Sequence, residues 1–304
     1  QHFRAETIVL DEGFKKMGKT SHQKKWKESI FEVYKKASIN PKWTKVLSNE
    51  CKKYKIDFLT APYDLKYVDQ VNKFIPAYKI GSGDITWKEI IIKIAKKNKP
   101  VLLACGASSL KETIDAVKLI LKINKKIVLM QCNTNYTGTD HNNQHLNLRV
   151  FESYRDKFVN SVLGLSDHMV EDSIVLASVA MGARVVERHF TDDTSRRGPD
   201  HPFSMNPDSW NQMITKVREL EVMLGNGIKS IEDNEIETSV VQRRALCLTQ
   251  DLNKGARLTE SDLEALRPCP KGAFAPHQIN ELVGEKVKVN LSKGTILKLE
   301  HLER

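Results

Sequence analysis

The sequence is poor in the features that mark membrane, secreted and nucleic-acid-binding proteins. No apolar run reaches 18 residues, so it predicts no transmembrane helix and no membrane partner. Aromatic residues make up only 7% and no nucleic-acid motif occurs, so the net charge of +10 predicts a small anionic substrate and no nucleic acid. The few cysteines form no CxxC pair, which favours reduced thiols and a cytoplasmic location: Cys51, Cys105, Cys132, Cys247 and Cys269.

Apolar and helical segments alternate along the first 225 residues. Six apolar runs predict strands, each followed by a segment with helical spacing, and they begin at Ile56, Ala77, Pro100, Lys126, Ser161 and Arg184. Ser109 and Glu112 have capping-box spacing at the start of one of these helices. Such alternation predicts an α/β fold with a parallel sheet.

A (β/α)8 TIM barrel is the natural closed form of this sheet, but two of its strands are absent from the sequence. We expect the two strands before Gln1, because no other part of the chain has room for them. The alternative is an open doubly wound sheet, which normally carries a glycine-rich nucleotide loop. No GxGxxG sequence is present, so the barrel is preferred.

The pattern of apolar and polar residues changes after residue 225. We expect the barrel domain to span 1–225 and an acidic linker containing SIEDNEIET to span 226–240. The remainder, 241–304, has short apolar runs, glycine turns and the proline-rich segment RPCP. It predicts a separate, compact, β-rich module of about 60 residues, a size at which small domains can fold alone.

Two histidines follow neighbouring predicted strands. His168 lies just past the strand Ser161–Leu165, and His189 ends the strand Arg184–Phe190, with one crossover helix between them. Because parallel strands end at the same edge of a sheet, the two imidazoles are expected to converge there. Two imidazoles at an open edge suit a divalent ion such as Mn²⁺, Zn²⁺ or Co²⁺. For either histidine alone, a hydrogen-bonded structural role is the commoner alternative.

Other polar residues are expected at the same edge. Lys79 interrupts an apolar strand, so it should be buried or face a pocket and needs an anion, for which Glu187 is a candidate. Ser82 and Ser166 beside it suit phosphate or carboxylate binding, with ordinary turn or cap roles as the alternative. Asp200 follows the second histidine in a loop, where it could reach the same edge or be only a turn residue.

These motifs resemble those of the sialic acid synthase family, the N-acetylneuraminate, legionaminate and pseudaminate synthases. The resemblance runs through the whole chain in the family's order. It is carried by PAYKIGSGDIT (76–86), KPVLLACGASSLKE (99–112), GLSDH (164–168), VAMGARVVERHFT (179–191), GPDHPFSMNP (198–207) and NKGARLTESDLEALRPCP (253–270). It implies a TIM barrel whose first βαβ unit precedes Gln1, followed by a C-terminal antifreeze-like (SAF) domain.

The resemblance also implies cofactor and substrate sites. His168 and His189 would hold Mn²⁺ or another divalent cation, and Lys79, Ser82 and Ser166 would bind phosphoenolpyruvate. Ala61 and Ala104 stand where many members carry hydroxyl groups, so Thr60 and Thr134 are expected to take over phosphate contacts. The sugar-binding set would be Gln1, Asp84, Tyr136, Asp200 and Arg267. Arg267 would reach from the antifreeze-like domain of the other chain in a domain-swapped homodimer and touch the N-acyl region of the sugar.

The implied activity is that of a transferase that joins phosphoenolpyruvate to an N-acyl-mannosamine-type sugar, an N-acyl-hexosamine. The product is a nonulosonic acid and phosphate is released. The cation would polarise the sugar aldehyde and Asp84 would handle a proton, where members commonly carry a glutamate. Three alternatives remain open: another metal-dependent barrel aldolase or hydrolase, a non-enzymatic carbohydrate- or ice-binding protein, and an inactive truncated paralogue.

Overall fold

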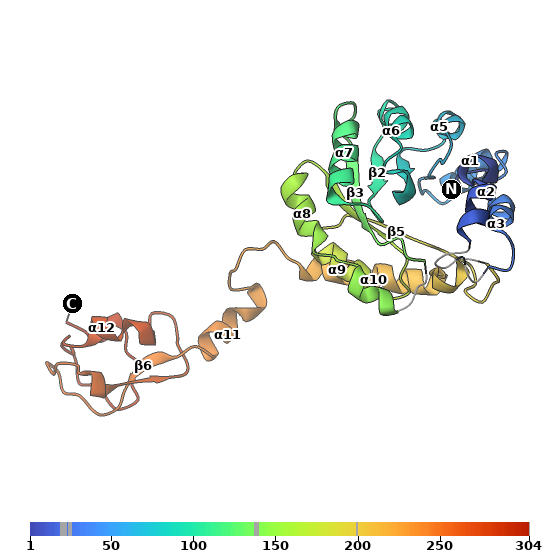
Figure 1. The fold of residues 1–304 in the computed structure, drawn as a ribbon. Helices are drawn as coiled ribbons and strands as arrows, with labels where there is room; N and C mark the ends of the chain where they lie inside the picture. The colour runs from blue at the N-terminus through green and yellow to red at the C-terminus, as the bar shows by residue number, and fades with distance from the viewer. Residues whose placement is uncertain (19–22, 24–25, 137–139, 199, 304) are drawn as a thin grey trace. The chain divides into compact units, whose positions relative to one another are not determined.

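The chain folds into two compact units, Gln1–Gly225 and Asn226–Arg304. In this computed structural model the described residues are 1–18, 23, 26–136, 140–198 and 200–303 (Figure 1). Within these ranges, no helix is both long enough and apolar enough to cross a membrane.

The first unit is built on a parallel sheet in which each strand pairs with the next one along the chain. This confirms the parallel alternation predicted from residue 77 onward. The strands are β1 (Tyr78–Ile80), β2 (Val101–Ala104), β3 (Ile127–Cys132), β4 (Val162–Asp167) and β5 (Val185–Arg188).

The strand predicted at Ile56–Ala61 is wrong in extent. This segment pairs only through single parallel bridges, Thr60 with Tyr78 and Pro62 with His2. The side chains of Ile56 and Leu59 are exposed, so the first part of the segment does not pack against the core as a strand would. Pro62 has no N–H group to donate, so the hydrogen-bond ladder with β1 cannot continue past Thr60. The two bridges nevertheless continue the parallel order beyond β1.

Helices line the outside of the sheet, and Figure 1 shows α5 to α8 following one another along the strands. Strand residues that face the helices form the hydrophobic core, among them Tyr78, Leu103, Leu129 and Leu165. The capping box predicted for Ser109 and Glu112 is confirmed at the start of α7. The helices of this part are α4 (Trp43–Lys53), α5 (Leu65–Val71), α6 (Lys88–Ala95), α7 (Leu110–Leu121), α8 (Val150–Lys157), α9 (Ser173–Ala180) and α10 (Pro207–Met223).

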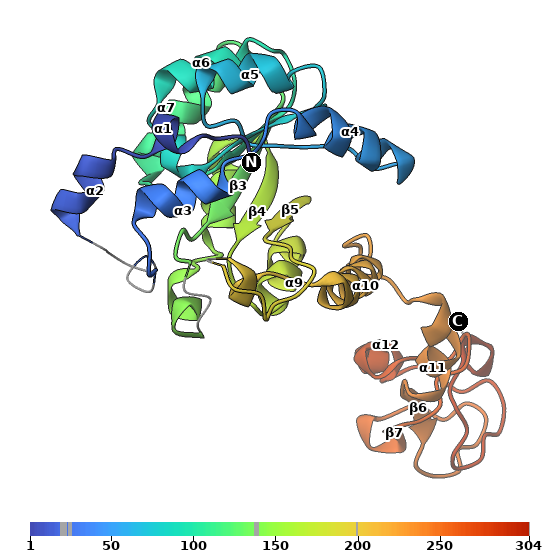
Figure 2. The same ribbon diagram turned by 90° about the vertical axis from the view of Figure 1, so that its right-hand side faces the viewer.

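Three short helices precede α4. They are α1 (Ala5–Ile8), α2 (Asp11–Met17) and α3 (Ile30–Ala37), and α3 contacts both of the others. They lie together near the N-terminus in both views of the molecule (Figure 2). Neither α1 nor α2 was predicted from the sequence.

The sheet is strongly curled, so that its two outer strands face each other. Lys79 of β1 and Glu187 of β5 form an ion pair in which Nζ and Oε2 are 2.8 Å apart. In a flat sheet these strands would lie about 19 Å apart, because adjacent strands are spaced by about 4.8 Å. Two side chains cannot span that distance. The five strands therefore form a half-barrel around a polar interior.

The second unit contains a small antiparallel pair, β6 (Ala245–Leu248) and β7 (Leu263–Leu266), extended by isolated antiparallel bridges. Its own hydrophobic core includes Leu246, Leu258, Phe274 and Leu297. Two short helices accompany it, α11 (Ile236–Val241) and α12 (Ile279–Leu282). Helix α11 lies in the stretch for which a linker was expected.

Gly164 of β4 is predicted to be intolerant of any side chain. A Cβ atom there would lie 2.9 Å from the carbonyl oxygen of Val185 and 3.0 Å from Cγ of Met130. We expect Gly164→Ala to lower the free energy of unfolding by about 1–3 kcal/mol through this overpacking. Thermal unfolding measures the effect. Gly83→Ala is the control, because nothing lies within 4 Å of a Cβ there, and an equal melting temperature for both variants would contradict the prediction.

Candidate functional site

The ion pair between Lys79 and Glu187 forms the centre of the half-barrel's polar face. The Lys79 side chain is only 11% exposed, whereas Glu187 is 44% exposed and also accepts a hydrogen bond from Ser166 Oγ at 3.0 Å. Burial would raise the pKa of Glu187, but Lys79 and Ser166 outweigh burial and hold that pKa below its usual value. The expectation that Lys79 is buried beside an anion is confirmed.

The ends of β1, β2 and β3 meet beside this pair. The Gly106 backbone N–H after β2 donates to Ser82 Oγ at 3.0 Å. A Cβ atom at Gly106 would lie 2.7 Å from Cγ2 of Thr134 and 3.0 Å from Cys132 Sγ. A glycine at 106 thus allows the ends of β1, β2 and β3 to converge. We call Lys79, Ser82, Gly106, Thr134 and Ser166 the polar cluster, and its cation and hydroxyl donors suit an anion.

The two histidines converge at the same edge. Their ring centres are 5.2 Å apart, with 55° between the ring planes. Nδ1 of His168 donates to the carbonyl oxygen of Asn133 at 2.9 Å, which leaves Nε2 as the electron-pair donor. Burial lowers the pKa of His168 to about 4, so its imidazole is neutral at pH 7, as metal binding requires.

The imidazole pair, His168 and His189, has the chemistry and spacing for one divalent ion. Neutral imidazole nitrogens are common ligands of divalent transition-metal ions, and both rings lie at the same edge of the sheet. In the described parts of the chain, no group of three or more histidine, cysteine or acidic side chains is arranged as a metal site. His168 and His189 are the residues that would hold such an ion.

A buried ion pair lies immediately before the two histidines. Asp167 of β4 and Arg188 of β5 are opposite each other in the strand register, and Arg188 Nε is 3.0 Å from Asp167 Oδ2. Their side chains are 2% and 1% exposed. Arg188 also donates to the carbonyl oxygen of Met169. This network fixes the register of β4 and β5, and with it the places from which the histidines extend.

Aromatic and acidic side chains surround the imidazole pair. The Tyr136 ring centre is 4.2 Å from that of His168, and the Phe203 ring centre is 5.0 Å from that of His189. Phe203 is buried in the short 3₁₀ helix His201–Phe203. The Asp200 carboxylate lies 3.4 Å from Nδ1 of His189. Tyr136 and Asp200 are therefore beside the histidines, as the sequence analysis expected.

Asp84 ends the 3₁₀ helix Ser82–Asp84 that follows β1. Burial raises its pKa to about 6, so its carboxyl group exchanges a proton close to neutral pH. It shares this helix with Ser82 of the polar cluster. Asp84 is consequently an acid–base group placed beside a candidate anion site.

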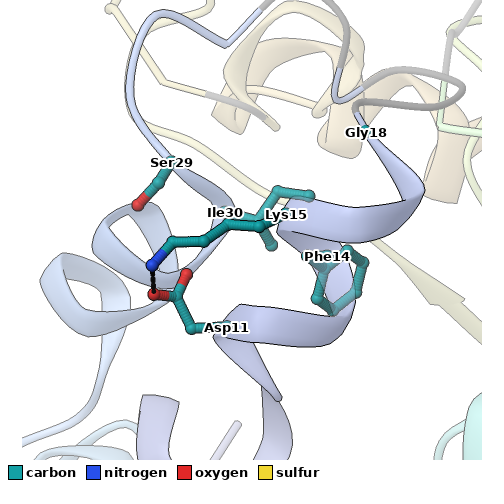
Figure 3. A pocket seen from close by; sticks show the side chains of 6 residues that line it. All are labelled: Asp11, Phe14, Lys15, Gly18, Ser29 and Ile30. Atoms are coloured by element: carbon teal, nitrogen blue, oxygen red, sulfur yellow. Dashed lines mark ion pairs between the residues drawn. The ribbon is translucent and has the colours of Figure 1, made fainter.

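The remaining predicted residues are Gln1, Arg267 and Thr60. Gln1 directly precedes the bridge residue His2 and lies close enough to Glu187 for their charges to interact. Arg267 is exposed in the second unit directly after β7. The Thr60 hydroxyl hydrogen-bonds to Nδ1 of His2 at 2.8 Å, so it is engaged there rather than free for the phosphate contact that was expected. A separate pocket of about 180 Å³ between α2 and the start of α3 contains none of the predicted residues (Figure 3).

The structural roles of several residues that shape this site were not predicted. Each lies within a motif quoted for the resemblance, but its role depends on contacts between segments that are separate in the sequence: Gly106, Asp167, Arg188 and Phe203. Asp167 and Arg188 each stand one residue before a histidine. Because successive side chains of a strand point to opposite faces, this spacing could have indicated an ion pair on the face opposite to the histidines.

Comparisons with known proteins cover both units. Residues 1–229 match the NeuB family and residues 243–303 match the SAF domain. The chain is 33% identical to the N,N'-diacetyllegionaminic acid synthase of Legionella pneumophila, over 100% of this chain and 85% of that protein. It is 32% identical to the Campylobacter jejuni enzyme of the same name, over 89% and 80% of the two chains.

A solved structure shares the fold. The putative spore coat polysaccharide biosynthesis protein E of Chromobacterium violaceum superposes with a TM-score of 0.77 at 21% identity, covering 100% of this chain and 88% of that one. The barrel fold with a C-terminal SAF domain, inferred above from the resemblance, is confirmed. Given a family match that covers three quarters of its length, this chain belongs to the NeuB family.

Proposed function

We propose that this protein condenses phosphoenolpyruvate with an N-acyl-mannosamine-type sugar to form a nonulosonic acid and phosphate. One observation carries the proposal: the polar cluster and the imidazole pair lie at one edge of the same half-barrel, joined by Ser166, Glu187 and their strand neighbours. The relatives are synthases of N,N'-diacetyllegionaminic acid, which supports a sugar that carries N-acyl groups. Nothing in the family match favours another aldolase, a hydrolase or a carbohydrate-binding protein.

Phosphoenolpyruvate would bind at the polar cluster. Lys79 Nζ is already largely buried and lies 2.8 Å from Glu187 Oε2. A substrate oxyanion could therefore pair with the ammonium group in place of Glu187, without removing further water from the lysine. Ser82, Thr134 and Ser166 add hydroxyl groups around it. These donors would hold the substrate's C3 atom toward the imidazole pair and stabilise charge as phosphate leaves.

His168 and His189 would hold a divalent cation, for which we propose Mn²⁺. When bound, that ion supplies Lewis acidity toward the carbonyl oxygen of the open-chain sugar. Tyr136 and Asp200, which flank the imidazole pair, would orient the sugar together with Gln1. Phe203 packs against His189 and limits water on that side.

Arg267 and the quaternary structure belong to the same proposal. Arg267 is exposed at the end of β7 and free to approach another chain. We propose that in a domain-swapped homodimer it reaches the sugar in the other subunit's site. A biosynthetic reaction that uses phosphoenolpyruvate is consistent with the cytoplasmic location expected from the scattered thiols.

The first prediction is that condensation depends on both histidines. Phosphoenolpyruvate, Mn²⁺ and a panel of N-acyl-hexosamines are mixed with the protein, and phosphate release and the nine-carbon acid are measured. The wild type should form both products in equal amounts, whereas His168→Ala and His189→Ala, and wild type in EDTA, should form neither. His277→Ala in the second unit is the control, since that histidine is exposed and lies outside the site. Full activity without either histidine would contradict the proposal.

The second prediction concerns pH. We propose that Asp84 acts as the base that accepts a proton from the attacking water, a role that needs the ionised carboxylate. With a pKa near 6, kcat should rise as the pH increases through about 6. Asp84→Asn should remove this limb of the profile and lower kcat by about 100-fold or more. A rate that falls as the pH rises through 6, or an unchanged acidic limb in the variant, would refute this role.

A further inference from the structure

The first residues after β3 form a tight turn beside the imidazole pair. Asn133 begins this turn, because its side-chain Oδ1 accepts a hydrogen bond from the backbone N–H of Asn135 at 3.1 Å. An asparagine bonded to the backbone two residues on makes an Asx turn, which fixes the local course of the chain. Tyr136 follows the turn directly, and its ring centre is 4.2 Å from that of His168. The turn therefore carries the chain into the site.

The other end of the same amide group binds a segment farther along the chain. Nδ2 of Asn133 donates to the carbonyl oxygen of His145 at 3.0 Å. His145 is the last residue of the 3₁₀ helix Asp140–His145. The amide group is planar and both of its ends are engaged. Rotation of the Asn133 side chain would consequently break at least one of these two hydrogen bonds.

The backbone carbonyl of Asn133 completes the arrangement. Its oxygen accepts the hydrogen bond from Nδ1 of His168 at 2.9 Å, and this bond leaves Nε2 as the electron-pair donor. His168 is only 7% exposed, so little water can reach the ring to replace this acceptor. The backbone torsions of Asn133 set the direction of its carbonyl group, and the Asx turn restrains those torsions. The side chain of Asn133 thus controls where its own carbonyl oxygen points.

We propose that Asn133 is a positioning residue for the imidazole of His168: its side-chain amide holds the backbone carbonyl that selects the Nδ1–H form of the ring and keeps Nε2 available to a divalent cation. The part that concerns the cation rests on the proposed function, whereas the choice of ring nitrogen is a property of the metal-free protein. Asparagine suits this role because it combines an acceptor and a donor on one short planar group. Aspartate keeps only the acceptor, and alanine keeps neither.

Asn133→Ala is the test, and its first readout requires neither substrate nor metal. Long-range ¹H–¹⁵N spectra of the metal-free protein show which ring nitrogen of each histidine carries the proton, and the spectrum of His168→Ala identifies the signals of this ring. The wild type should show the Nδ1–H form of His168. In Asn133→Ala the carbonyl is no longer held, so the Nε2–H form should become populated.

The second readout is the affinity for the cation. Mn²⁺ is titrated into the protein without substrates, and the electron paramagnetic resonance signal of the free ion gives the Kd. Loss of a group that orients a metal-binding histidine weakens metal binding, so the Kd of Asn133→Ala should rise by about 10-fold or more. Asn133→Asp retains the acceptor of the Asx turn and should lie between wild type and Asn133→Ala in both readouts. Should Asn133→Ala fail to fold, Asn133→Asp decides the matter by the same two measurements.

Gln131→Leu provides the matched control. Nε2 of Gln131 donates to the carbonyl oxygen of Leu146 at 3.0 Å, one residue beyond the carbonyl that Asn133 holds. This variant therefore loses an amide hydrogen bond to the same segment but keeps the Asx turn and the carbonyl of Asn133. It should retain the Nδ1–H form of His168 and the wild-type Kd for Mn²⁺. Thermal unfolding establishes that the compared variants are folded.

The outcomes separate this inference from the proposed function. If Asn133→Ala retains the Nδ1–H form of His168 or binds Mn²⁺ as tightly as the wild type, the inference is overturned and the proposed function stands. Equal changes in Gln131→Leu would assign the effect to the segment as a whole and would overturn it as well. A wild type that binds no Mn²⁺ and forms no product overturns the proposed function, while the spectra still decide whether Asn133 selects the form of the ring.

Discussion

The contact between Lys79 and Glu187 is the constraint on which the rest of the site depends. It joins the first and last strands of the five-stranded sheet across the interior, which is possible only because the sheet is curled. A lysine inside a half-barrel requires an anion, and Glu187 provides one before any substrate arrives. The same curvature brings the polar cluster to the edge where the two histidines meet.

The alternation of side chains along each strand separates structure from chemistry. On β4, Leu163 and Leu165 face the helices and pack in the core, whereas Gly164 and Ser166 face the interior. Asp167 belongs to the helix-facing set, where it pairs with Arg188. The two networks lie on opposite faces of the same two strands, so the buried pair can fix the histidines without occupying their site.

Much of this arrangement could be predicted from local sequence pattern. The capping box at Ser109, the strands from residue 77 and the convergence of His168 with His189 follow from periodicity and from parallel pairing. The role of Gly106 could not, because it depends on the close approach of segments far apart in the chain. The helices α1 and α2 were missed because they are short and carry little apolar periodicity, and Ile56–Ala61 looked like a strand although its first residues have no partner strand.

The central claim is that one edge of the half-barrel holds an anion at Lys79 and a cation at the imidazole pair. A crystal structure of the protein with phosphoenolpyruvate and Mn²⁺, with anomalous scattering to locate the ion, tests it most directly. We expect phosphoenolpyruvate oxygens within hydrogen-bonding distance of Lys79 Nζ and Ser82 Oγ, and the anomalous peak between His168 and His189. Phosphoenolpyruvate bound away from Lys79, or a manganese peak remote from both imidazoles, would contradict the account.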